Sequence, residues 1–113
     1  SATPICADES CHVAADVERL AGRYQAVNIK LDKTGGLTEA LALLTAARAA
    51  GMQVMTGCMI CSSLSIAPAF LVAAQADFAD LDGPLWLADD HADGVRLAGG
   101  RLAAPSGDLW GGR

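Results

Sequence analysis

One stretch of the sequence, residues 28–36, constrains the fold of this chain more than any other. An apolar run ends here at Lys30, and the chain then turns through Gly35 and Gly36 into a long segment rich in alanine and leucine. Parallel α/β proteins place functional side chains at the carboxyl ends of strands, directly before the turn into the next helix. Lys30 is therefore the first candidate for a functional residue.

Strand-like and helix-like segments alternate along most of the chain. The apolar periodicity predicts strands at residues 4–7, 24–30, 52–55 and 77–82. It predicts helices at residues 11–21, 37–50 and 62–76, with Ser10 as the cap of the first and Pro68 tolerated within the third. Elements that alternate at this spacing form a parallel sheet with right-handed crossovers, so the predicted fold class is α/β.

The character of the sequence changes after Gly83. A short strand is predicted at residues 84–88, and residues 95–97 and 101–103 flank Gly99 and Gly100 in the pattern of a two-residue β-hairpin. The glycine-rich residues 105–113 are expected to be irregular. We therefore expect two parts, residues 1–83 with the strand and helix repeats and residues 84–113 with the hairpin and tail.

Charge and hydropathy exclude several classes of partner. The net charge is -5, and no basic stripe of the kind that binds nucleic acid or an anionic membrane is present. No apolar run approaches the length of about 18 residues that a membrane span needs, and no secretory signal pattern is visible. These features predict a cytoplasmic protein that binds neither nucleic acid nor membrane. Because the chain begins at Ser1, we also expect it to be processed or part of a longer protein.

The four cysteines, Cys6, Cys11, Cys58 and Cys61, form two close pairs in the sequence. Zinc sites place such pairs in tight turns, whereas Cys6 lies in a predicted strand and Cys11 begins a predicted helix. Buried reduced thiols are the default for a cytosolic chain. A structural zinc module nevertheless stays open as an alternative.

Charged side chains follow three of the predicted strands. Asp8 follows the first strand and Lys30 the second, while Asp80 and Asp82 lie at the fourth. Residues two apart on a strand share a face, so Asp80 and Asp82 are predicted to point together into one pocket and to face a cation. The coincidence of these groups at one end of one sheet indicates a functional site.

These residues carry a resemblance to a known family. The chain resembles the last four barrel strands of the enolase superfamily, most closely the dipeptide epimerases of its muconate-lactonizing subgroup. The resemblance is carried by Ala7-Asp8-Glu9-Ser10, Asn28-Ile29-Lys30-Leu31, Gly35-Gly36, Gly57, Met59-Ile60, Asp80-Leu81-Asp82 and Pro84-Leu85.

The resemblance implies the C-terminal half of a (β/α)₈ TIM barrel, strands five to eight, followed by a short β-hairpin tail. A complete barrel takes about 250 residues, so the N-terminal half of the same enzyme is an expected partner. Four barrel strands alone would also leave sheet edges and one apolar face exposed, which favours a homo-oligomer. We expect Ile5, Val27, Ile29 and Val54 to form that face.

The chemistry that the resemblance implies is Mg²⁺-dependent epimerisation of L-Ala-D/L-Glu-type dipeptides through an enediolate. Asp8 would be one Mg²⁺ ligand, and Lys30 would move a proton at the α-carbon, with its pKa lowered by a nearby cation or by burial. Asp80 and Asp82 would bind the ammonium group of the dipeptide substrate. Met59 and Ile60 are also assigned to substrate binding, whereas Lys33 is expected to be solvated.

Other enzymes of the same subgroup stay open as alternatives. Cycloisomerases, o-succinylbenzoate synthases and N-acylamino acid racemases share the aspartate and the lysine but have no need for the pair Asp80 and Asp82. An isolated 113-residue chain would lack the opposing lysine and the other metal carboxylates of the family, so we expect it to be inactive alone.

Overall fold

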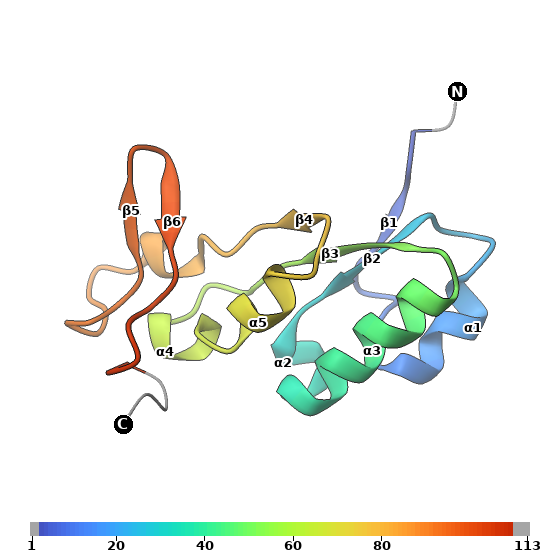
Figure 1. Cartoon of the computed structure of the whole chain (residues 1–113), viewed down its shortest axis with the longest axis horizontal. Helices are drawn as coiled ribbons and strands as arrows, with labels where there is room; N and C mark the ends of the chain where they lie inside the picture. The colour runs from blue at the N-terminus through green and yellow to red at the C-terminus, as the bar shows by residue number, and fades with distance from the viewer. Residues whose placement is uncertain (1–2, 110–113) are drawn as a thin grey trace.

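The computed structural model describes residues 3–109 and contains a parallel sheet with helices packed on one face (Figure 1). Its four strands lie in chain order, and each pairs in parallel with the next. The strands are β1 (Cys6–Ala7), β2 (Ala26–Ile29), β3 (Gln53–Thr56) and β4 (Phe78–Ala79). The predicted α/β class and the parallel pairing are therefore confirmed.

The helices are mostly short. They are η1 (Ala14–Asp16), α1 (Val17–Leu20), α2 (Leu31–Thr34), α3 (Leu37–Ala49), α4 (Ser63–Ile66), α5 (Ala69–Ala73) and η2 (Gly83–Trp86). Helix α3 agrees with its prediction, and α2 was not predicted. Within residues 3–109, no helix has both the length and the apolar character needed to cross a bilayer.

The helix predicted at residues 11–21 is wrong in its first half, because a side chain holds the backbone out of helical geometry there. The Asp16 carboxylate accepts hydrogen bonds from the backbone N–H groups of His12 (2.9 Å) and Val13 (3.0 Å). Val13 is accordingly extended, with φ of -133° and ψ of 166°. Regular helix begins only after Asp16, so Ser10 does not cap it.

The third predicted helix is divided at Pro68. A proline has no backbone N–H and disturbs the preceding turn, so α4 ends at Ile66 and α5 begins at Ala69. Another proline explains the error at residues 84–88, where a strand was predicted. Pro84 lies in the first turn of the 3₁₀ helix η2, a position that suits its fixed φ and needs no N–H donor.

The hydrophobic core lies between the sheet and the helices. Val27, Ile29 and Val54 are completely buried and belong to one cluster with residues of α3 such as Leu43 and Ala47. The expectation that these three residues form the uncovered face is therefore wrong. Ile5 is 59% exposed, but it precedes β1 and is not part of the buried cluster.

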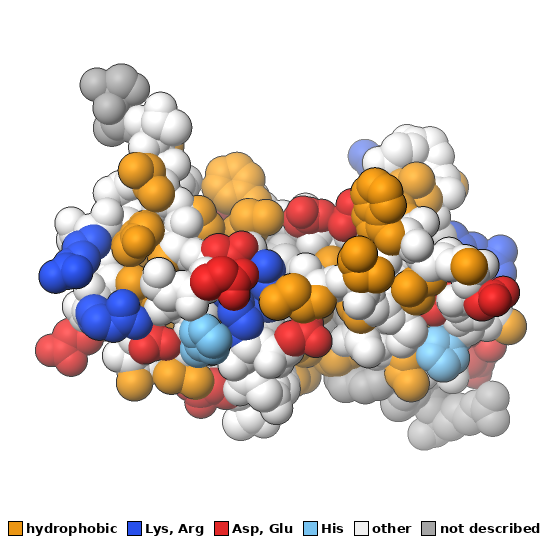
Figure 2. Space-filling model, turned by 180° about the vertical axis from the view of Figure 1, so that it is seen from behind, with side chains coloured by type: hydrophobic (Ala, Val, Ile, Leu, Met, Phe, Trp, Pro, Cys, Tyr) orange, Lys and Arg blue, Asp and Glu red, His pale blue; other side chains and the backbone are white. Residues whose placement is uncertain are grey.

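The other face of the sheet carries no helix from the described part of the chain. Side chains alternate along strands, so the neighbours of the core residues point to this side. A shallow hollow of about 250 Å³ lies here, lined by Pro4, Cys6, Ala26, Gln53, Met55 and Phe78. Phe78, one of the residues that line this hollow, is 55% exposed. Figure 2 shows hydrophobic side chains between charged ones on the rear surface.

An antiparallel pair follows η2 at the residues predicted for a hairpin. Strands β5 (Arg96–Ala98) and β6 (Arg101–Ala103) are joined by Gly99 and Gly100, both at positive φ as a two-residue hairpin turn requires. Residues 110–113 of the predicted tail lie outside the described residues. The residues that precede the hairpin are linked to α4 through Ser63. Its hydroxyl donates to Asp90 and accepts from the N–H of Val95 at 2.9 Å.

Candidate functional site

The candidate site lies along the edge of the sheet where the parallel strands end. Asp8, Lys30, Gly57 and Asp80 each come directly after a strand, from β1 to β4 in that order. The carboxyl ends of parallel strands meet at one edge, which explains why groups distant in sequence gather here. The sheet thus brings together the strand-end residues that the sequence singled out.

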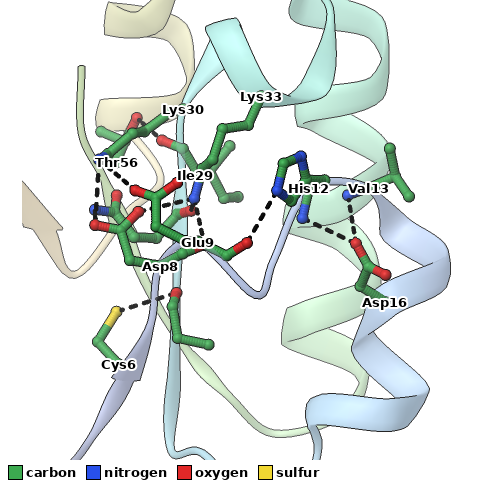
Figure 3. Close-up of polar contacts among 12 residues, drawn as sticks. Cys6, Asp8, Glu9, His12, Val13, Asp16, Ile29, Lys30, Lys33 and Thr56 are labelled. Carbon is green, nitrogen blue, oxygen red and sulfur yellow. Dashed lines mark hydrogen bonds and ion pairs between the residues drawn. The ribbon is translucent and has the colours of Figure 1, made fainter. Parts of the chain in front are cut away.

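A cluster of charges surrounds Asp8 (Figure 3). The ammonium nitrogen of Lys30 lies 3.2 Å from Asp8 Oδ2 and 3.7 Å from Glu9 Oε1. Lys33 Nζ lies 2.8 Å from the other oxygen, Asp8 Oδ1, and also donates to the backbone carbonyl of Asp8. Asp8 and Lys30 therefore lie at one end of the sheet as expected, and they form an ion pair that was not predicted, with a second lysine beside it.

Lys33 was expected to be solvated, and that expectation is wrong. Its side chain is only 4% exposed, and its ammonium also donates to the Asn28 carbonyl at 3.2 Å. The cause is α2, the short helix that begins directly after Lys30 and turns the chain back over Asp8. The sequence offered no signal for this burial, because the contact partner, Asp8, lies 25 positions earlier in the chain.

The charges shift the pKa values of the cluster. Burial raises the pKa of Asp8, but hydrogen bonds from Lys33 and Lys30 lower it by more, so it lies below its ordinary value. Burial lowers the pKa of Lys30, but the hydrogen bond and charge of Asp8 and the charge of Glu9 raise it above its ordinary value. The expected lowering of the Lys30 pKa is therefore wrong in this chain, because two carboxylates outweigh burial.

Asn28 is a site residue that the sequence interpretation missed. It is 5% exposed, and its Nδ2 donates to Asp8 Oδ2 at 3.3 Å. Its Oδ1 is buried and has no hydrogen-bond partner among residues 3–109, a situation that typically costs about 1–3 kcal/mol. The available signal was the period of two along a strand, which places Asn28 on the same side of β2 as Lys30.

Gly57 gives the amide of Asn28 and the side chain of Lys30 the space that they occupy. A Cβ atom at position 57 would lie 2.8 Å from Asn28 Oδ1 and 3.2 Å from Lys30 Cε. Real Cβ atoms essentially never approach another heavy atom as closely as the first of these distances. A glycine is therefore required at this strand end for steric reasons.

Asp80 and Asp82 lie beside each other, but not on a strand as predicted. Strand β4 ends at Ala79, and Asp82 is the residue before η2. Burial and then the charge of Asp82 raise the pKa of Asp80, whereas the charge of Lys30 lowers it in part. The two carboxylates therefore act on each other, and Asp80 lies within the field of Lys30.

Trp86 is a second residue that the sequence interpretation missed. Its indole Nε1 donates to Asp82 Oδ2 at 3.1 Å, and its side chain is 70% exposed. Met59 and Ile60, predicted to bind substrate, are 41% and 71% exposed in the loop after β3. Gly83 allows η2 to approach this loop, because a Cβ there would collide with the Met59 carbonyl oxygen.

The cysteines do not form a metal site in the described part of the chain. All four are free thiols. Burial raises the pKa of Cys61 to about 11, which disfavours the thiolate that zinc binding needs. Among residues 3–109, no three His, Cys, Asp or Glu side chains are placed to hold one metal ion. Asp8 alone could therefore contribute only part of a coordination shell.

Comparison with known proteins shows similarity to a family of enzymes. A family model described as enolase C-terminal domain-like matches residues 1–108. The chain is 58% identical to the L-Ala-D/L-Glu epimerase of Escherichia coli over 88% of its own length and 31% of that protein. It is 52% identical to the N-acetyl-D-glutamate racemase of Pseudoalteromonas sp. over 99% of its length and 36% of that protein. The chain thus spans about a third of these relatives.

Solved structures agree with these relatives. An enolase family member from Agrobacterium tumefaciens, with homology to dipeptide epimerases and with bound sodium and L-Ala-L-Glu, superimposes with a TM-score of 0.91. It is 51% identical, and the match covers 95% of this chain and 33% of the other. A dipeptide epimerase from Methylococcus capsulatus complexed with Mg and L-Arg-D-Lys gives a TM-score of 0.79 and 41% identity, covering 89% and 31% of the two chains.

Proposed function

The chain belongs to the enolase C-terminal domain-like family, and from this premise we propose that it is the C-terminal half of the (β/α)₈ barrel of a Mg²⁺-dependent dipeptide epimerase. The strands β1 to β4 would be barrel strands five to eight, and the substrate would be of the L-Ala-D/L-Glu type. The observation that supports this most is the ion pair of Lys30 with Asp8 at the ends of adjacent strands, with Asp80 and Asp82 on the same edge.

The reaction would move one proton at the α-carbon of the substrate's C-terminal residue. Lys30 carries that proton on one face of the α-carbon, and a lysine in the missing half of the barrel serves the other face, so that the centre is inverted. Mg²⁺, when bound, supplies a Lewis acid that stabilises the negative charge of the enediolate. Positioned acids and bases of this kind typically contribute factors of about 10² to 10⁴ in rate.

Asp8 fits the role of one Mg²⁺ ligand. Its side chain is 42% exposed at a strand end, and Mg²⁺ prefers carboxylate oxygens. Lys33 and Asn28 would hold this carboxylate in place, since both already donate to it. The remaining ligands would come from the half of the barrel that this chain does not contain.

Asp80 and Asp82 would bind the ammonium group at the other end of the dipeptide. The Trp86 indole fixes one oxygen of Asp82, which limits the orientations of the carboxylate. Hydrogen bonds between charged groups are the stronger ones in proteins, and here they would fix the substrate relative to Lys30. Met59 and Ile60, exposed in the neighbouring loop, would contact the apolar part of the substrate.

A second function, racemisation of N-acetylglutamate, is favoured by the similarity to the Pseudoalteromonas enzyme. Both candidate substrates are glutamates with an acylated amino group, and both have the same α-proton. They differ in that only the dipeptide carries an ammonium group. Assays of the complete protein with Mg²⁺ and either L-Ala-L-Glu or N-acetyl-D-glutamate test the proposed function and distinguish the two substrates.

Replacement of Asp82 by alanine in the complete protein should raise the KM for L-Ala-L-Glu by about 10- to 150-fold, the effect of losing one hydrogen bond to a charged group. The KM for N-acetyl-D-glutamate should change little, because that substrate has no ammonium group. The matched control is Asp93→Ala, which removes another exposed aspartate, one that follows η2. An unchanged dipeptide KM in Asp82→Ala would refute the ammonium-binding role.

The isolated chain should not persist as a monomer. Within residues 3–109, strands β1 and β4 are unpaired on their outer edges, and the face of the sheet that carries Met55 and Phe78 has no covering helix. Edges and apolar faces of this kind drive association, here with the N-terminal half or with a second copy. Sedimentation equilibrium at micromolar concentration measures this, and a stable monomer with cooperative unfolding would contradict it.

A further inference from the structure

The amide of Asn28 lies between the two groups that the proposed reaction depends on. Its Nδ2 and the Lys30 ammonium both bind the same atom, Asp8 Oδ2, at 3.3 and 3.2 Å. Its other end, Oδ1, is buried without a hydrogen-bond partner. Buried acceptors are nearly always paired in proteins, so an unpaired one beside a catalytic lysine calls for an explanation.

The side chain of Lys30 lies beside the same space as Asn28 Oδ1. The position that a Cβ of residue 57 would occupy is 2.8 Å from Asn28 Oδ1 and 3.2 Å from Lys30 Cε. Oδ1 and Cε therefore border the same small space beside Gly57, and the ammonium nitrogen is one bond beyond Cε. An ammonium has three N–H donors, and among the described residues Lys30 pairs with the carboxylates of Asp8 and Glu9.

We propose that Asn28 is a positioning residue for Lys30, an inference that rests on the proposed function. Nδ2 holds the Asp8 carboxylate, and Oδ1 accepts a hydrogen bond from the Lys30 ammonium when Lys30 leaves Asp8 to reach the substrate. A neutral amide suits this task, because it orients an ammonium without adding a charge. Gly57 is part of the same arrangement, because any side chain there would displace the Asn28 amide.

A purely structural role would favour a different residue. Leucine has nearly the same shape as asparagine and leaves no buried acceptor unpaired, and replacing polar groups by apolar ones of similar shape is often neutral or stabilising. Asn28→Leu in the complete protein therefore separates the two roles. We expect kcat for L-Ala-L-Glu to fall about 10- to 100-fold, as for one hydrogen bond to a charged group, while KM changes less than about threefold.

Two further variants sharpen the test. Gly57→Ala should lower kcat to a similar extent, and the double variant should lose little beyond either single one, because both act on the same contact. Thr56→Val is the matched control, since Thr56 is also completely buried but its hydroxyl donates to the backbone carbonyl of Ile29 and not to the Lys30 side chain. Its kcat should stay within about twofold of wild type. Asn28→Ser, which is too short to reach Lys30, replaces Asn28→Leu if that variant does not fold.

A measurement without substrate tests the contact directly. The ¹⁵Nζ signal of Lys30 in the spectrum of the complete protein is the one that Lys30→Arg removes. Asn28→Leu should shift this signal, whereas Thr56→Val should not. An unshifted signal, a kcat within threefold of wild type in Asn28→Leu, or additive losses in the double variant would each overturn the proposal. If the wild-type protein turns over neither substrate, the proposed function fails, and the spectra still decide whether Asn28 contacts Lys30.

Discussion

Replacing Lys30 by alanine should abolish epimerisation of L-Ala-L-Glu by the complete protein, with kcat reduced by about 10² to 10⁴-fold or more. We propose Lys30 as the proton carrier on one face of the α-carbon. Lys33 would not replace it, because its side chain is buried and its ammonium is held by Asp8 and the Asn28 carbonyl. Dipeptide binding should persist, since Asp80 and Asp82 remain. Proton exchange in D₂O measures the first effect, and calorimetric titration with the dipeptide measures the second.

The control for this variant is Arg19→Ala. Arg19 also pairs with an aspartate, Asp16, at 3.1 Å, but it lies on α1, outside the edge where the strands end. Its replacement removes a positive charge and an ion pair without touching the site, so kcat should stay within about twofold of wild type. Near-normal turnover by Lys30→Ala would show that Lys30 does not carry the proton.

The isolated 113-residue chain should show no epimerase activity. In the described residues, no three acidic, histidine or cysteine side chains are placed to hold a metal ion, and Asp8 alone is a weak site. Lys30 alone can protonate or deprotonate only one face, so inversion of the centre needs a group from elsewhere. We therefore expect the complete protein to turn over dipeptide under conditions in which the fragment does not.

The test uses equal molar amounts of both proteins with Mg²⁺ and L-Ala-L-Glu, and product formation is followed by chiral chromatography. The complete protein serves as the control for substrate and metal quality. Turnover by the purified fragment alone would contradict the proposal that this chain is half of a site.

The parallel sheet and the helix α3 could be predicted from the sequence because both depend on local periodicity. The apolar residues of β2 and α3 recur with the strand and helix periods, and Gly36 and Gly51 mark the ends of α3. The positions of Asp8 and Lys30 at one edge followed from the general property that parallel strands end together. These features need no knowledge of tertiary contacts.

Other features could not be predicted because they depend on contacts between distant residues. Lys33 is buried only because α2 returns the chain over Asp8, which lies 25 positions earlier in the sequence. The helix predicted at residues 11–21 is shortened because the Asp16 side chain binds the backbone N–H groups of His12 and Val13. The spacing of Asn28 from Lys30 was visible in the sequence, but nothing in the sequence shows that its amide binds Asp8 or that its acceptor lacks a partner.

The buried face of the sheet was assigned to the wrong side for a related reason. A parallel strand covered on both sides is apolar throughout, so Val27 and Ile29 give no indication of which side carries the helices. The contacts with α3 decide it. Asn28 lies on the other side of the sheet, the same side as Lys30, and this side would face the interior of the proposed barrel.

The most direct test is proton exchange by the complete wild-type protein in D₂O with Mg²⁺. The glutamate α-proton signal of L-Ala-L-Glu should disappear from the ¹H spectrum as deuterium enters, and L-Ala-D-Glu should form at the same time. The same experiment with Lys30→Ala should show neither change. A wild-type spectrum that keeps its α-proton signal, in protein shown to be folded and loaded with Mg²⁺, would contradict the assignment of this chain to an epimerase.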